Sequence, residues 1–206
     1  MKFILAAPSS DNLIRLLKAW RFWLLGAVAG ALIGAAIYLI AQPNYRASAT
    51  VNVDFHLEQA WPQNTDREQF YYLERETRKL EEVAMSDAVL SVVASQVGGL
   101  TIQELRDGML QLSQPGNGGW HFYADHRDPH KAEALASAWA QAFTQSVKTQ
   151  VAQPSSTLEQ YITAEPAQTT GLTAHRSVSM GIYLLMGAIG FLALAGLGIL
   201  FFEVQA

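Results

Sequence analysis

The sequence contains no cysteine, which excludes disulfide bonds, thiolate nucleophiles and cysteine-ligated metal sites. It also lacks a glycine-rich phosphate loop, a Walker sequence, and the HExxH and GxSxG patterns of zinc proteases and serine hydrolases. No nucleophile is arranged with a base and an orienting group in any pattern that the sequence displays. We therefore expect no catalytic residues, no cofactor and no metal site, and we do not expect the chain to be an enzyme.

Two long stretches of the chain lack charge altogether. Residues 22–41, FWLLGAVAGALIGAAIYLIA, and residues 178–202 contain no Asp, Glu, Lys, Arg or His. Twenty residues at helical rise span about 30 Å, the thickness of the hydrocarbon core of a bilayer. Both stretches are therefore predicted to be transmembrane helices, and the missing charge argues against a proton or ion pathway through them.

A cleaved signal peptide is the alternative interpretation of the first apolar stretch. Ala47-Ser48-Ala49 matches a small-x-small cleavage pattern. The apolar region of a signal peptide has about 7–15 residues, however, and this stretch is longer. We therefore favour an uncleaved anchor.

The charge outside these stretches is unevenly distributed. The first 21 residues carry four Lys or Arg against one Asp, a net charge of +3, whereas residues 42–177 carry ten Lys or Arg against sixteen Asp or Glu, a net charge of −6. Positive charge beside the first span predicts a cytoplasmic N-terminus, so that both termini are cytoplasmic and the middle of the chain is periplasmic or extracellular. An acidic domain also argues against nucleic acid as a partner.

These patterns predict five segments. Residues 10–21 have basic side chains between the apolar residues Leu13, Ile14, Leu16, Leu17 and Trp20, which indicates an amphipathic helix on membrane lipid at the cytoplasmic surface. The predicted segments are a cytoplasmic amphipathic N-terminus (1–21), transmembrane helix 1 (22–41), an outward-facing α/β domain (42–177), transmembrane helix 2 (178–202) and a cytoplasmic tail (203–206).

Three glycines in the first span, Gly26, Gly30 and Gly34, repeat every four residues. Glycines at this spacing share one face of a helix and allow another backbone to approach closely. We interpret this face as a helix-packing site in the membrane. Packing on the second span and packing between subunits fit the pattern equally well, and the second span offers its own small residues less regularly, at Gly187, Gly190, Ala193 and Gly198.

The middle of the chain has the pattern of an α+β domain, in which a small mixed sheet is packed by helices. Apolar residues alternate in strands, and the predicted helices begin at capping residues such as Ser86, the Thr101–Glu104 capping box and Asp128 before Pro129. The charged side chains of the first helix of this domain are expected to form a solvated face. Strands are predicted at 46–54, 110–113, 120–125 and 158–164. Helices are predicted at 65–84, 87–97, 101–109 and 129–151, and the first begins at a Thr65–Glu68 capping box and has Phe70, Leu73, Leu80 and Val83 as its apolar face. Turns are predicted at 98–99 and 115–119, and a tether at 165–179.

Five residues, His121, Asp125, His126, Asp128 and His130, form a cluster that resembles a metal site in composition. His121 and His126 are five residues apart along a predicted strand and turn, so their side chains are expected on opposite faces. Asp128 is already used as a helix cap. We interpret the cluster as ordinary turn chemistry.

The chain as a whole resembles a known family, the polysaccharide co-polymerases or Wzz-type chain-length determinants. It resembles a short form of the family, without long coiled-coil helices or a kinase domain. Three stretches carry the likeness: Tyr45–Val53, which follows Pro43 after the first span; Ser86–Leu90; and the Asp128-Pro129 helix start with its alanines through Ala136. The likeness covers nearly the whole length. The proline-rich approach to the second span seen in the family is reduced to Pro166.

The resemblance implies a membrane scaffold of the bacterial inner membrane rather than an enzyme. Members of the family assemble as a ring-like homo-oligomer that regulates the chain length of O-antigen lipopolysaccharide, capsule or exopolysaccharide. The implied partners are other copies of the chain, a polysaccharide polymerase or export machinery, membrane lipid and the growing polysaccharide. The alternative function is a two-span sensor or adaptor subunit whose outer domain binds a ligand or a partner protein.

Overall fold

The computed structural model describes residues 20–60, 66–114, 119–153 and 156–202. The predicted amphipathic N-terminus, the Thr65 end of the first capping box, the tip of the turn at 115–118 and the tail at 203–206 lie outside the described residues. The chain divides into two compact units. One, the helix pair, contains residues 1–43 and 178–206, and the other, the α/β domain, contains residues 44–177.

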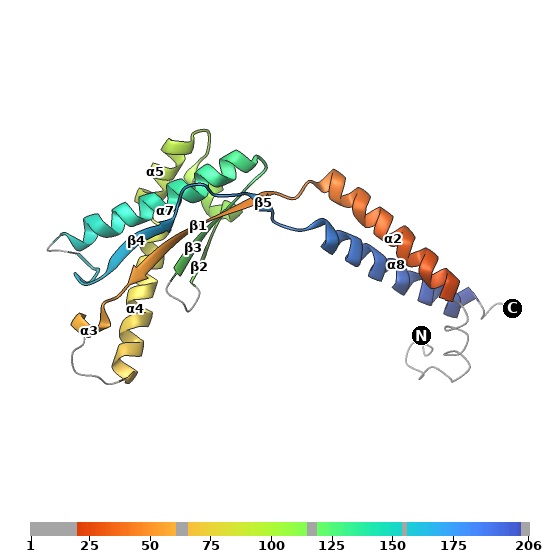
Figure 1. Ribbon diagram of the computed structural model, residues 1–206, viewed down its shortest axis with the longest axis horizontal. Coiled ribbons are helices and arrows are strands. Elements are labelled where there is room, and N and C mark those ends of the chain that lie inside the picture. The colour runs from red at the N-terminus through yellow and green to blue at the C-terminus, as the bar shows by residue number, and fades with distance from the viewer. Residues whose placement is uncertain (1–19, 61–65, 115–118, 154–155, 203–206) are drawn as a thin grey trace. The chain divides into compact units, whose positions relative to one another are not determined.

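The helix pair consists of α2 (Trp20–Ala41) and α8 (Met180–Phe202), which lie side by side and antiparallel (Figure 1). Both helices are long and apolar enough to cross a membrane. The prediction of two apolar helices that flank a folded α/β domain is therefore confirmed. The first helix begins two residues before the predicted span and the second two residues after it.

A third stretch also meets the length and composition test for a span, as a helix that is broken by a bend of 107° between residues 69–97 and 102–109. Within it, Val89, Leu90 and Val93 are buried. These side chains belong to the hydrophobic core of the α/β domain. Because they are used in that core, we assign this stretch to the folded domain.

The α/β domain is built on a sheet in the order β2-β3-β1-β4, with β5 also paired to β1. All strand pairs among the described residues are antiparallel, so the predicted mixed sheet is wrong. The reason is that β1 lies between β3 and β4, which run in the same direction and are joined across it by α7. The strands are β1 (Tyr45–Asp54), β2 (Leu110–Ser113), β3 (Gly119–His126), β4 (Thr163–Gln168) and β5 (His175–Arg176).

The last predicted strand is displaced toward the C-terminus. Leu158 and Ile162 are buried, but both lie outside any strand, and β4 starts only at Thr163. Part of the predicted tether is therefore strand, including β5. The sequence was misleading here because Pro166 argues against a strand, whereas a sheet edge such as β4 tolerates proline.

Three helices cover the sheet on one side. α7 (Pro129–Val151) packs on β1, β3 and β4, α5 (Asp87–Val97) packs on α7, and α4 (Asp66–Ala84) contacts both helices (Figure 1). Three aromatic rings fill the space between α7 and the sheet: Phe122 lies edge-on to Trp139 at 4.8 Å between ring centroids and 5.1 Å from Phe143. A short helix, α3 (Leu57–Ala60), was not predicted.

The predicted helix caps are present where the structure describes them. Ser86 caps α5, Asp128 caps α7 with Pro at its first position, and Thr101 forms a reciprocal capping box with Glu104 at α6 (Ile102–Glu104). Hydrogen bonds from the backbone and side chain of Thr101 lower the pKa of the Glu104 carboxyl. The predicted helix through residue 109 is only partly regular, because residues 105–109 form a wider turn in which Gly108 has φ 134°.

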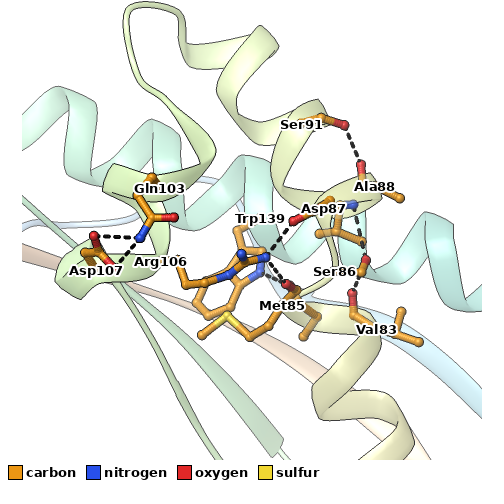
Figure 2. A network of polar contacts seen from close by, with 12 residues as sticks. Val83, Met85, Ser86, Asp87, Ala88, Ser91, Gln103, Arg106, Asp107 and Trp139 are labelled. Atoms are coloured by element: carbon orange, nitrogen blue, oxygen red, sulfur yellow. Dashed lines mark hydrogen bonds and ion pairs between the residues drawn. The ribbon is translucent and has the colours of Figure 1, made fainter.

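The junction between α4 and α5 is held by one side chain from α7 and one from the turn at residues 105–109 (Figure 2). Trp139 Nε1 donates a buried hydrogen bond of 2.8 Å to the carbonyl of Ala84, the last residue of α4. Arg106 Nη2 donates to the next carbonyl, that of Met85, at 3.1 Å and to Asp87 Oδ1 at 2.6 Å. The two carbonyls at the end of α4 therefore have donors although the helix has ended.

We predict that removal of these two donors lowers the free energy of unfolding by different amounts. Trp139→Phe leaves the Ala84 carbonyl buried without its donor and should lower the free energy of unfolding of the domain by about 1–3 kcal/mol. Arg106→Met acts on exposed groups, with the Arg106 side chain 43% and that of Asp87 76% exposed. It should cost about 0–1 kcal/mol. Guanidinium unfolding of the full chain in detergent, followed by far-UV circular dichroism, measures both, and equal losses would contradict this assignment.

Candidate functional site: a glycine-packed helix pair and a polar sheet face

The predicted glycine face lies against α8 in the structure. Gly30 and Gly34 are the two buried residues of α2. A Cβ atom built at Gly30 would collide with the carbonyl oxygen of Gly187 and lie 2.7 Å from the Cβ of Phe191. At Gly34 it would collide with the carbonyl oxygen of Tyr183. The backbones of the two helices are therefore in direct contact, which only glycine allows at these positions.

Gly26 has a looser position than the other two glycines. A Cβ atom there would lie 3.4 Å from the Cβ of Ala195, an ordinary packing distance. Trp23 on α2 makes a further contact with α8, because a Cβ atom built at Gly196 would lie 2.8 Å from its ring. Of the two arrangements that the sequence left open, the structure contains the packing of the two spans within one chain.

On α8, the sequence pattern identified only part of the contact. Gly187 lies at the crossing, where an added Cβ would collide with the carbonyl oxygen of Gly30. Among the residues that the structure describes, no atom lies within 4 Å of such a Cβ at Gly190 or Gly198, and Gly196, which was not among the predicted residues, packs on Trp23. Spacing alone did not reveal which glycines of α8 lie at the contact, because α8 has small residues on several faces.

The contrast between Gly187 and Gly190 gives a direct test. Gly187→Ala should destabilise the helix pair by about 1–3 kcal/mol, because the added methyl group forces the two backbones apart. Gly190→Ala places the same methyl group in open space on the same helix and should leave stability unchanged or slightly raised. Denaturation of the full chain in increasing dodecyl sulfate, monitored by tryptophan fluorescence, compares them. Equal denaturation midpoints for the two variants would show that the backbones of the two helices are not in close contact at Gly187.

The open face of the sheet is polar, whereas the face under α7 is apolar. Along β1, Ala47, Ala49 and Val51 are buried, and the residues between them point to the other face. Arg46 and Asp125 are paired across β1 and β3 through two hydrogen bonds of 2.7 and 2.6 Å. This hydrogen-bonded carboxylate raises the pKa of the Arg46 guanidinium. The open face of these strands also carries Ser48, Thr50, Asn52, Gln111, Ser113, His121 and Tyr123.

The predicted histidine and aspartate cluster is divided among local contacts. His121 Nδ1 is 3.2 Å from Thr50 Oγ1, and Asp125 binds Arg46. His126 Nδ1 accepts from the backbone N–H of Asp128 at 2.9 Å. The Asp128 carboxylate in turn accepts from the N–H of His130 at 2.9 Å as the cap of α7. No group of three His, Asp or Glu side chains within the described ranges could hold a metal ion.

The charged face predicted for α4 contains an exception. Glu76 is fully buried, so its assignment to an exposed face is wrong. Its Oε1 accepts hydrogen bonds from Arg75 Nε at 2.9 Å and from Lys79 Nζ at 2.7 Å. Lys79 also donates to the carbonyl of Thr157 at 2.6 Å. The buried carboxylate thus connects α4 to the segment before β4, and a buried charge of this kind needs such partners.

The apolar face of α4 is correspondingly shorter than predicted. Leu80 and Val83 are buried, whereas Phe70 is 63% exposed. Tyr72, one turn before Glu76, is 6% exposed and takes a place in the buried face. Its burial raises the pKa of the phenol to about 12, with the nearby carboxylates of Glu76 and Glu159 adding to the shift.

Tyr72 should give the domain a weakness at alkaline pH. An unfolded phenol ionises from about pH 10, whereas this one stays neutral to about pH 12 in the fold. Since the folded pKa is raised, the contribution to stability is present below pH 10 and is lost as the pH rises toward 12. Subtracting the absorbance titration of Tyr72→Phe from that of the parent chain gives a difference curve for this tyrosinate alone. Its midpoint should lie near pH 12.

Glu76→Gln is the matched variant for this titration. It keeps the size of the side chain and removes one of the charges that raise the pKa of Tyr72, so the midpoint of the difference curve should fall. A difference curve with its midpoint at an ordinary tyrosine pKa in the parent chain would contradict the burial of this phenol.

The chain matches no protein-family model, and its sequence matches no curated protein. The arrangement of the two units' own residues is therefore the basis for a functional hypothesis. It consists of two closely packed apolar helices and a separate domain whose exposed sheet face offers hydroxyl, amide, imidazole and phenol groups. This combination can hold a domain at a membrane and can present a polar surface to a partner.

Proposed function

We propose that the chain is a two-span membrane scaffold of a polysaccharide biosynthesis or export system, of the Wzz-type co-polymerase class. In this role it regulates the length of O-antigen, capsule or exopolysaccharide chains as a ring-like homo-oligomer. It makes and breaks no bond itself. Its partners are other copies of the chain and the polymerase or export machinery, and the growing polysaccharide passes close to its outer domain.

The observation that carries this proposal is the way the α/β domain is closed at its chain ends. The backbone N–H of Ser177 donates to the carbonyl of Asn44 at 2.8 Å, and β5 pairs with the first residues of β1. The guanidinium of Arg176 also lies 4.3 Å from the centre of the Tyr45 ring. Both connections to the apolar helices therefore leave from one end of the sheet, as a domain fixed to a membrane at two points requires.

Orientation in the membrane forms part of the proposal. The net charge of +3 in the first 21 residues supports a cytoplasmic N-terminus, and an even number of spans returns the C-terminus to the same side. The α/β domain then faces the periplasm or the outside of a bacterial inner membrane. That is the compartment in which O-antigen and exopolysaccharide chains are extended or exported.

An exposed aromatic pair supports assembly into an oligomer. Phe70 and Tyr71 on α4 are 63% and 56% exposed, and their ring centroids are 6.1 Å apart. Aromatic side chains are enriched in the surfaces that subunits bury against one another. We assign this pair to a contact between copies of the chain.

Two measurements test the proposed function together. Mass photometry of the full chain in nanodiscs should give one defined assembly of many subunits, and Phe70→Ser should lower its mass. Val92→Ser, which changes a side chain that is 41% exposed on α5, is the matched control and should leave the assembly intact.

The second measurement concerns the polysaccharide. Deletion of the gene should change the distribution of polysaccharide chain lengths on gels, and the parent chain supplied in trans should restore it. A monomeric protein together with an unchanged polysaccharide would reject the proposal and would favour the sensor or adaptor function.

A further inference from the structure

One end of the sheet is basic, in contrast to the rest of the domain. In the register of the three strands there, Tyr45 lies between His126 and Arg176, and Arg46 lies between Asp125 and His175. Arg127, which follows β3, and Lys131, in the first turn of α7, are exposed. We call this surface the basic end, and define it by Arg46, His126, Arg127, Lys131, His175 and Arg176.

The contrast in charge is large. Residues 44–47, 124–131 and 174–177 contain four Lys or Arg and two Asp, a net charge of +2. The rest of residues 44–177 contains six Lys or Arg and fourteen Asp or Glu, a net charge of −8. The carboxylates at this end are also already engaged. Asp125 binds Arg46, Asp128 caps α7, and Glu133, two residues beyond the counted range, accepts from the backbone N–H of Ala174 at 3.1 Å. The positive charge is therefore collected at one end of an otherwise acidic domain.

The covalent chain limits how far this end can lie from the apolar helices. Tyr45 follows the last residue of α2 by four positions, and Arg176 precedes the first residue of α8 by four. Four residues of fully extended chain reach at most about 14 Å. In a helix that spans a bilayer, the ends lie at the level of the lipid headgroups, so the cations of this end are within reach of headgroup phosphates.

We propose that the basic end binds the headgroups of anionic phospholipids, so that this end of the domain rests on the membrane surface. The cations supply the attraction, and the acidic remainder of the domain is repelled by the same negative surface. Arg127 and Lys131 are the exposed contacts, and Arg176 is held in place by stacking on Tyr45. This inference rests on the two apolar helices crossing the membrane, and it does not depend on the role in polysaccharide synthesis.

The absence of cysteine makes a site-specific test simple. Ser177→Cys places a fluorophore beside the basic end, and Ser95→Cys places one on α5 as a reference. The full chain is reconstituted in nanodiscs of phosphatidylcholine alone or with phosphatidylglycerol, each with a trace of lipid that carries a spin-labelled headgroup. Quenching of the label at 177 should be at least about twofold greater in the anionic discs and should decline as salt is raised.

A pair of double variants isolates the charge. Arg127→Gln with Lys131→Gln removes two exposed cations of the basic end, and quenching in anionic discs should fall to the level in phosphatidylcholine. The matched control, Arg78→Gln with Lys148→Gln, removes the same charge from α4 and from the far end of α7 and should leave the quenching unchanged. Circular dichroism establishes that both variants are folded.

Two outcomes would overturn the proposal. One is equal quenching at position 177 in anionic and neutral discs. The other is an equal effect of the two double variants, which would indicate a response to net charge and not to the basic end. A monomeric protein together with an unchanged polysaccharide in the deletion strain would reject the proposed function and leave this inference standing, so the two can fail separately.

Discussion

The central position of β1 is the constraint on which the α/β domain depends. One edge of β1 pairs with β3, the other edge pairs with β4 and β5, and its apolar face lies under α7. Because β1 is also the first strand after α2, the chain must return to its other edge before it can reach α8. The hydrogen bond between Ser177 and Asn44 is the last step of that return. A single strand thus organises the core and brings together the two ends of the α/β domain, at Asn44 and Ser177.

Local sequence rules predicted the parts of this domain that depend on local chemistry. Ser86, Thr101 and Asp128 each begin a helix where a capping side chain was expected, because a cap satisfies N–H groups within three residues of itself. The errors fall where distant contacts decide. Glu76 is buried where its Oε1 binds Arg75 and Lys79, and Lys79 also binds the carbonyl of Thr157 from far along the chain. Pro166 is accepted in a strand because that strand is at an edge. Neither fact can be read from periodicity.

The two apolar helices show the same division between what spacing predicts and what packing decides. The repeat of Gly26, Gly30 and Gly34 predicted one face of α2, yet these three glycines are not equivalent, since only two of them touch backbone so closely that a side chain is excluded. Their partner could not be predicted from α2 alone. It is Gly187 that completes the contact, because two backbones can meet only where both helices lack a side chain at the crossing.

This contact also bears on the choice between scaffold and sensor. A two-span sensor needs two arrangements of its helices that differ by a few kcal/mol, so that a ligand can shift the population between them. With Gly30 and Gly187 backbone against backbone, a slide of either helix along the other would bring Phe191 or Tyr183 toward the crossing, where there is no room for a side chain. Closely packed interfaces resist such gradual displacement. The helix pair is therefore better suited to hold the domain in place than to transmit a movement, which favours the scaffold.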